Sequence, residues 1–321
     1  MDLKQLKTFI RVAETGSLSK ASDRLRLAQP ALSRHIKLLE QAVRAPLFVR
    51  SGRGMLLTDA GQRLLNRVAG LVYQLESSLD EVRSSGAMPS GTVAFGMMPT
   101  VSYLLAARLM RRVAEELPAV SLRVVDGYAG HLIDWLQRGE IDATLLYGPA
   151  SDFHARTTSL AFEELVLVGP TAASEVRTDS ISTKMLAGFD LVLPSRPHGL
   201  RAVAEAAARK AGVELKVRFE ADSFHVLKEL VEIGLGRTLL PRSAIHREET
   251  AGHLQAIRIR NPKIMREIVL ALPPSRSDTR ATVAVVALVR DEIDRMIVSG
   301  EWAAVRAGAR PSRSGVASRR S

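Results

Sequence analysis

The chain has 321 residues, 46% of them hydrophobic and none of them cysteine. This length allows two or more domains, and the missing cysteines exclude disulfides, thiolate metal sites and cysteine nucleophiles. The net charge of +11 lies at the two ends: residues 1–58 hold eleven Lys and Arg against four Asp and Glu, residues 302–321 hold five Arg and no acid, and residues 59–301 sum to −1. No apolar run reaches the ~18 residues of a membrane span and the first ten residues lack a signal-peptide core, so we expect a soluble, cytoplasmic protein.

The first three predicted elements are helices. Residues 3–14 are amphipathic, and Gly16 follows them as a plausible C-terminal cap. A short helix over residues 19–25 comes next, with Ser19 as its expected N-terminal cap. The third helix covers residues 28–42. Two short helices joined by a tight turn predict a helix-turn-helix, whose second helix enters the major groove of DNA.

The third predicted helix has two different faces, and Pro30 fits its first turn. One face is apolar at the spacing of a buried stripe, with Leu32, Ile36 and Leu39. The other carries side chains that can bind base edges and phosphates, namely Gln29, Ser33, Arg34 and Lys37. A solvated helix face and a solvated basic surface are the alternatives, but charge and motif together favour nucleic-acid binding.

A β-hairpin follows Pro46. The segments LFVR and MLLT read as two short strands joined by residues 51–54, which are rich in glycine. Arg53 at the tip and Arg50 at its base are placed to reach phosphates or a minor groove. Three helices and a hairpin predict a winged helix-turn-helix domain over residues 1–58.

A long helix is expected from Thr58, its N-terminal cap, to about Arg83, within a linker unit over residues 59–88. Its apolar positions nearly sustain a heptad repeat: Leu64, Val68, Leu71, Leu75, Leu79 and Val82. This spacing favours a coiled-coil seam that pairs two chains, although an amphipathic helix packed on its own domain has the same pattern.

From Thr92 short apolar strands alternate with helices, which predicts parallel sheets covered by helices. We expect a two-lobed α/β effector domain of the periplasmic-binding-protein kind over residues 89–301, with lobe one at about 92–162 and 268–300 and lobe two at about 163–267. The cleft between such lobes is the default small-molecule site. The basic residues 302–321 are expected to form a disordered tail.

Candidate effector-binding residues follow the predicted strands and begin helices, where N–H groups can hold an anion. Lobe one offers Thr100, Ser102, Gly130 and His131, and lobe two offers Ser195, Arg196, Asp222 and Ser223. Each residue also has an alternative role without a ligand. The hydroxyls and Asp222 could simply cap helices, and His131 and Arg196 could be solvated surface residues. We expect a small polar effector that bears a carboxylate or a similar group.

Residues 3–61 resemble the N-terminal domain of LysR-type transcriptional regulators. Many residues fall in that family's order and spacing, among them Phe9, Gly16, Ala21, Gln29, Pro30, Ser33, Ile36, Leu39, Phe48, Arg50, Thr58 and Gly61. The later GHLIDWLQRGEIDATLLYGP segment is similar to the nitrogen assimilation control subgroup. One departure is Ala28, where the family often has a Ser or Thr whose cap would contribute about 1 kcal/mol.

The resemblance implies a regulator that binds promoter DNA as a homotetramer built from dimers, bends it and responds to a small molecule. Residues 29, 30, 33 and 34 then occupy the family's DNA-contacting positions, Lys37 and Arg53 bind phosphate, and RNA polymerase is a further possible partner. No cofactor or metal is expected.

Three other functions fit less well. An enzyme is disfavoured because GxSxG, HExxH, P-loop and complete GxGxxG motifs are missing and the seven histidines form no cluster with metal-ligand spacing. A transport binding protein would need a signal peptide and no DNA-binding domain. An architectural DNA binder without an effector stays open at this stage, because it depends on whether a polar cleft exists.

Overall fold

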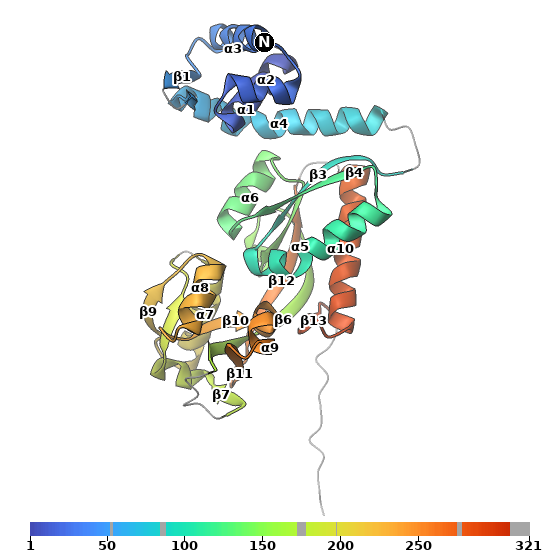
Figure 1. The fold of residues 1–321 in the computed structure, drawn as a ribbon. Coiled ribbons are helices and arrows are strands. Elements are labelled where there is room, and N and C mark those ends of the chain that lie inside the picture. Colours follow the sequence, from blue (N-terminus) through green and yellow to red (C-terminus); the bar gives the residue numbers. More distant parts are fainter. Residues whose placement is uncertain (52–53, 84–87, 172–177, 197, 275–277, 309–321) are drawn as a thin grey trace, which may run out of the picture.

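The computed structural model describes residues 1–51, 54–83, 88–171, 178–196, 198–274 and 278–308. Figure 1 shows a small helical domain at one end, the long helix α4 beneath it, and two α/β lobes beyond α4. No helix in these ranges is long and apolar enough to cross a membrane. The N-terminal domain comprises α1 (Leu3–Thr15), α2 (Leu18–Leu25), α3 (Gln29–Val43), β1 (Phe48–Ser51) and β2 (Gly54–Leu57), and α4 covers Asp59–Arg83.

The N-terminal domain is the predicted winged helix-turn-helix. Its fully buried core joins the three helices to the segment that leads into the hairpin, through Phe9, Ala21, Leu32, Leu39 and Leu47. The predicted cap of α2 was wrong by two residues, because Ser17 rather than Ser19 accepts a hydrogen bond from the backbone N–H of Lys20. The hairpin pairs in the antiparallel sense with Phe48 opposite Leu57.

Lobe one has a sheet whose strands include β3 (Gly91–Met97), β4 (Val120–Asp126) and β5 (Ala143–Tyr147). Its helices are α5 (Pro99–Glu116), α6 (Ala129–Arg138) and α10 (Arg280–Val298). β3 pairs with β4 and β5 in the parallel sense, as the alternation of strands and helices predicts. The core of this lobe lies between the sheet and the helices and continues through α10 to Trp302.

Lobe two contains β7 (Ser180–Ser182), β8 (Asp190–Leu193), β9 (Lys216–Glu220), β10 (Thr238–Pro241) and β11 (Leu254–Arg260). Its helices are α7 (Gly199–Ala211), α8 (Phe224–Glu232) and the short α9 (His246–Thr250). Short 3₁₀ segments cover Ala150–Asp152, Thr183–Gly188 and Arg242–Ile245. A second apolar core, separate from that of lobe one, lies between these elements.

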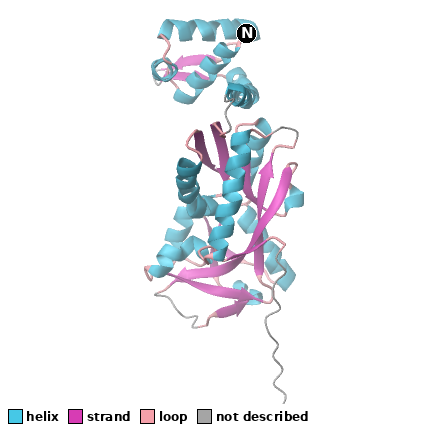
Figure 2. Cartoon of the chain, turned by 90° about the vertical axis from the view of Figure 1, so that its right-hand side faces the viewer, coloured by secondary structure: helices cyan, strands magenta, loops and turns pink. Residues whose placement is uncertain are grey.

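Two long antiparallel strands join the lobes, and the sequence analysis missed this arrangement. β6 (Arg156–Pro170) pairs with β12 (Ile264–Leu272) along nine residues, and both run from one lobe into the other (Figure 2). A single mixed sheet with the order β4-β3-β5-β12-β6-β11-β7 therefore passes through both lobes. The prediction of parallel sheets holds for β3, β4 and β5 but not for β6 and β12, because hydrophobic alternation does not reveal strand direction.

The predicted tail boundary at residue 302 was also wrong. Trp302 is buried, with 1% of its surface exposed, and β13 (Ala304–Arg306) pairs with β6. A composition rich in arginine hid this short strand. Residues 309–321 lie outside the described part of the chain.

Candidate functional site

Helix α3 presents the predicted DNA-reading face to solvent. Leu32, Ile36 and Leu39 pack into the N-terminal core, which fixes the rotation of the helix. Ala28 precedes the helix and makes no side-chain cap hydrogen bond. A hydrogen bond of 2.9 Å between Thr8 Oγ1 and His35 Nδ1 also joins α3 to α1. The orientation of the outer face is therefore set by burial on the opposite side.

The predicted DNA-contacting residues share this outer surface. Gln29, Pro30, Arg34 and Lys37 are exposed and Ser33 is half-buried. Arg50 is exposed on β1, next to the hairpin tip, while Arg53 lies outside the described residues. Glu40 accepts a hydrogen bond of 2.8 Å from the backbone N–H of Leu47, which fixes the hairpin against the end of α3. The arrangement places an amide, a hydroxyl and cationic groups on one convex surface.

The heptad positions of α4 divide into two sets. Leu64 and Val68 pack against the N-terminal core, which is the alternative that the sequence left open. Leu71, Leu75 and Leu79 are 62%, 47% and 39% exposed. The side chain of Val82 lies outside the described residues. Among the described heptad positions, those of the second half of the helix thus form an apolar row that stays open to solvent.

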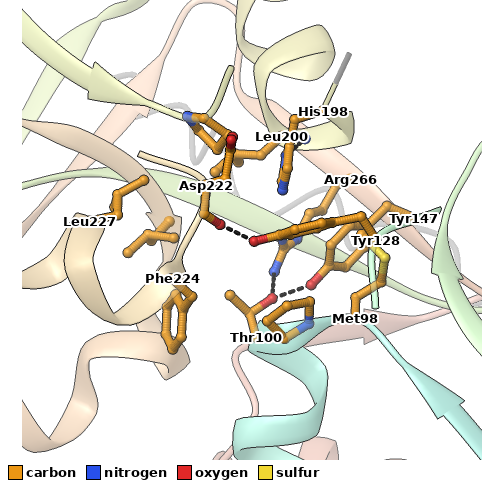
Figure 3. A pocket seen from close by; sticks show the side chains of 13 residues that line it. Met98, Thr100, Tyr128, Tyr147, His198, Leu200, Asp222, Phe224, Leu227 and Arg266 are labelled. Carbon is orange, nitrogen blue, oxygen red and sulfur yellow. Dashed lines mark hydrogen bonds between the residues drawn. The ribbon is translucent and has the colours of Figure 1, made fainter. Parts of the chain in front are cut away.

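A small cavity of about 30 Å³ lies between the lobes. Side chains from both lobes and from β12 surround it (Figure 3). Its polar lining residues are Thr100, Tyr128, Tyr147, His198, Asp222 and Arg266. Its apolar lining residues are Met98, Pro99, Pro194, Leu200, Phe224, Leu227 and Leu240. Such a mixture is typical of a small-molecule site with a few orienting groups.

A buried hydrogen-bonded chain reaches one side of this cavity. The Thr100 hydroxyl is hydrogen-bonded to the Tyr147 hydroxyl and accepts a bond of 3.0 Å from Arg266 Nη2. The Arg266 guanidinium also lies 3.8 Å from the centre of the Tyr147 ring. Burial raises the pKa of Tyr147 to about 12, so this phenol stays protonated.

Glu163 compensates the charge of Arg266. Arg266 Nε donates to Glu163 Oε1 over 2.5 Å, and the two side chains are 2% and 0% exposed. The second carboxylate oxygen accepts a bond of 2.9 Å from Trp302 Nε1. Strands β6 and β12 and the segment after α10 thus meet behind the cavity and hold Arg266 in place.

His198 faces the cavity from lobe two (Figure 3). Its Nδ1 accepts a bond of 3.1 Å from the backbone N–H of Leu200, so Nδ1 carries no proton. Burial lowers the pKa of His198, although Asp222 opposes this shift. The neutral ring therefore carries its proton on Nε2 and offers a donor there. Together with Arg266, it makes the polar lining rich in hydrogen-bond donors.

Several contacts join the lobes across the cavity. The Tyr128 hydroxyl, at the start of α6, donates to the backbone carbonyl of Asp222 in lobe two. The Tyr103 ring of α5 meets the Phe224 ring of α8 edge to face at 5.7 Å. The buried Lys228 ammonium lies 4.7 Å from the centres of both rings. These contacts tie the two lobes to each other across the cavity.

The predicted effector residues have mixed placements. Thr100 and Asp222 line the cavity, and Ser195 donates to Asp222 Oδ1 over 2.7 Å. This contact lowers the pKa of Asp222. The N-terminal cap of α8 is Ser223, which accepts from the N–H of Val226, and not Asp222. Six of the eight predicted residues do not line the cavity: Ser102, Gly130, His131, Ser195, Arg196 and Ser223.

Arg196 and His131 fail as cavity residues for evident reasons. Arg196 is 71% exposed and pairs with Glu205 at 2.6 Å. His131 is exposed and stacks on Trp135. Gly130 faces open space, and Ser102 lies two residues beyond Thr100, roughly 200° around α5 from it.

The sequence analysis did not select four residues that dominate the polar lining: Tyr128, Tyr147, His198 and Arg266. Tyr128 and His198 directly precede helices, and Thr100 lies in the first turn of α5, so the cavity residues do stand where helices begin, but at other positions than most of those predicted. Arg266 is in the middle of β12, and no local signal distinguishes it. Among the described residues, no group of three or more His, Asp or Glu side chains is placed to hold a metal ion.

Comparisons with known proteins match most of the chain. Residues 3–62 match the model of the bacterial regulatory helix-turn-helix proteins of the lysR family, and residues 86–294 match that of the LysR substrate binding domain. The transcriptional regulator BbuR of Bordetella bronchiseptica is 31% identical over 94% of this chain and 93% of its own length. The nitrogen assimilation regulatory protein nac of Klebsiella aerogenes is 30% identical over 76% of this chain and 79% of its own length.

Solved structures share the fold. A full-length variant of OxyR from Pseudomonas aeruginosa has a TM-score of 0.72 at 20% identity, covering 97% of this chain and 99% of its own. Full-length CbnR in complex with its target DNA has a TM-score of 0.70 at 19% identity, covering 92% of this chain and 99% of its own.

Proposed function

Because the chain belongs to the LysR family of transcriptional regulators, with a helix-turn-helix DNA-binding domain and an effector-binding domain, we propose that α3 reads promoter DNA and that the interlobe cavity binds the effector. On this proposal the chain is a binding protein rather than an enzyme, and it acts in the cytoplasm, where promoter DNA lies. The observation that carries the proposal is the outer face of α3, with exposed Gln29, Arg34 and Lys37 held outward by a buried stripe.

The roles of these side chains follow from their chemistry. Gln29 and Ser33, near the N-terminal end of α3, are placed to contact base edges. Arg34 and Lys37 lie further along the same surface, and Arg50 extends the positive charge onto the hairpin. We assign Arg34, Lys37 and Arg50 to phosphates, which fix the register of the protein on the duplex.

The test is DNA affinity as a function of salt, using a duplex selected from a random pool by the wild-type chain. Arg34→Ala should weaken binding and reduce the slope of log K against log[salt] by about 0.9, the value of one phosphate contact. Arg209→Ala, which removes an exposed arginine from α7, is the matched control and should leave both quantities unchanged. Equal affinity and slope for Arg34→Ala and the wild type would remove Arg34 from the interface.

We infer that the effector is small and carries hydrogen-bond acceptors, such as a carboxylate. The support is a set of polar groups at the small interlobe cavity: the Arg266 guanidinium, the Nε2–H of His198 and the hydroxyl of Thr100. Calorimetry against a panel of metabolites tests this, and binding by neutral apolar compounds alone would contradict it. Thr100→Val should weaken binding of the ligand found, whereas Ser102→Ala, two residues further along α5 and outside the cavity lining, should not.

We further propose that α4 pairs two chains and that such dimers associate into a tetramer. The support for pairing is the row of exposed leucines at positions 71, 75 and 79, spaced four apart on one face. A paired α4 places two copies of α3 in a symmetric arrangement, as two half-sites in DNA require.

A further inference from the structure

Helix α6 has one end at the interlobe cavity. Its N-terminal cap is Tyr128, whose hydroxyl donates to the Asp222 carbonyl of lobe two. The same ring lies edge to face against His198, with ring centres 4.7 Å apart. Opening of the cleft, or a ligand that displaces Tyr128, would therefore act directly on the first turn of α6.

The other end of α6 touches the linker helix. The helix ends at Arg138, and Gly139 caps it in the left-handed conformation with φ of 70°. The carbonyl of Arg138 is among the last four of the helix, which have no intrahelical partner. Arg123 of β4 donates to the carbonyl of Glu140, just beyond this end, over 2.9 Å and so braces the turn.

The turn at the end of α6 packs directly against Gly70 of α4. A Cβ atom at residue 70 would lie 1.5 Å from the Arg138 carbonyl oxygen and 2.6 Å from its carbon, so no larger residue fits. Gly70 is also buried in the middle of a 25-residue helix, where glycine is a poor helix former. Glycine is required at residue 70 because the two backbones approach too closely for a side chain.

The DNA-binding domain meets the same junction. Lys7 and Arg11 of α1, Val72 of α4, and Arg123 and Glu140 of lobe one all line one cavity. The exposed leucine row of α4 begins at residue 71 and lies roughly 100° to 180° around the helix from Gly70. Docking of lobe one on Gly70 and pairing of two α4 helices can therefore occur together.

We propose that α6 couples the interlobe cavity to the DNA-binding domain, through the docking of the Arg138 carbonyl on Gly70. This rests on the proposed function of both sites. The helix has ten residues, about 15 Å, and acts as a rigid connector. A change at Tyr128 moves its far end, and the tight fit at Gly70 passes the displacement to α4 and hence to the orientation of α3. A backbone contact with no room for adjustment transmits small shifts better than a soft side-chain contact.

The docking is tested first. Since the chain has no cysteine, spin labels at Arg67→Cys and Gln137→Cys, both exposed positions, report the separation of α4 and α6. Labelled chain is diluted with unlabelled chain, so that only distances within one chain are read. Gly70→Ala should lengthen and broaden the distance distribution. Gly188→Ala, where an added Cβ meets open space, is the control and should not. An unchanged distribution in Gly70→Ala would overturn the proposal.

The coupling is tested by a double-mutant cycle on DNA affinity, which needs no known effector. Tyr128→Phe removes the interlobe hydrogen bond and should change the Kd for a selected duplex by about fivefold or more in the wild-type background. In the Gly70→Ala background the same change should have less than about a twofold effect. Equal effects in both backgrounds, or no effect in either, would overturn the role of α6. If the wild-type chain selects no duplex at all, DNA binding itself fails, which is a different result.

Discussion

The buried pair between Glu163 and Arg266 offers a sharp test of the effector domain. Glu163→Gln keeps the size of the side chain and one acceptor oxygen but removes the charge that compensates Arg266. Both side chains are almost completely buried, and their nearest N and O atoms are 2.5 Å apart. Removing one partner of such a pair costs about 3–5 kcal/mol, because the remaining charge stays buried without compensation. For a domain of this size the loss corresponds to roughly 6–20 °C in Tm.

The assay is urea unfolding of the wild type and the variant, followed by circular dichroism, with Tm measured in parallel. The double variant Glu163→Leu/Arg266→Met serves as the control, because an apolar pair of similar volume recovers much of the stability lost when one charge is removed. A Glu163→Gln variant within about 1 kcal/mol of the wild type would refute the reasoning, since exposed ion pairs contribute only that much.

Four further predictions follow from the described contacts. Trp302→Phe should lower the free energy of unfolding by about 1–3 kcal/mol in urea titrations, because it leaves Glu163 Oε2 without its donor. An unchanged urea midpoint would show that the segment after α10 does not stabilise the fold through this bond. His198→Asn keeps a capping acceptor for the N–H of Leu200 but does not titrate. Since burial lowers the pKa of His198 in the folded chain, the unfolded chain binds the proton first as pH falls below about 6.5, and stability is lost there. The loss between about pH 7.5 and 5.5 should be smaller in this variant, and an equal loss would contradict the placement of His198. Leu75→Asp should raise the dimer Kd by about 100-fold or more in sedimentation, since each buried leucine contributes about 1.5–3 kcal/mol on both chains; Gln62→Asp on the same helix is the control, and equal effects would exclude the leucine row as the seam. Lys37→Ala should reduce the salt slope by about 0.9 without changing the preferred DNA sequence, and a changed preference would make Lys37 a base-reading residue.

The N-terminal domain could be predicted from sequence because its signals are local. The stripe of Leu32, Ile36 and Leu39 and the spacing of Gln29, Ser33 and Lys37 are set by one helical period. Glycine at the hairpin and Thr58 before α4 marked the ends of elements, and the Thr58 hydroxyl does accept from the N–H of Gly61 over 3.0 Å. Helix start and stop signals act over a few residues, so one sequence carries them.

The cavity was harder to predict because long-range pairing builds it. Arg266 is 103 residues from Glu163, and Trp302 is 139 residues from the same carboxylate. The antiparallel pairing of β6 with β12 brings Arg266 to Glu163, and that of β13 with β6 brings Trp302 close, but the hydrophobic pattern does not specify a pairing partner. Arg196 was chosen because it follows a strand, but it pairs with Glu205 instead and stays in solvent.

The most direct test of the central claim, that the outer face of α3 reads DNA, is selection from a random duplex pool by the wild type and by Gln29→Ala. We predict that the wild-type chain enriches a motif with two-fold symmetry. Gln29→Ala should lose sequence preference at one position in each half-site while keeping the rest, since one base contact is worth about 1–3 kcal/mol of discrimination. An identical motif from both proteins, or no enriched motif from the wild type, would contradict the claim.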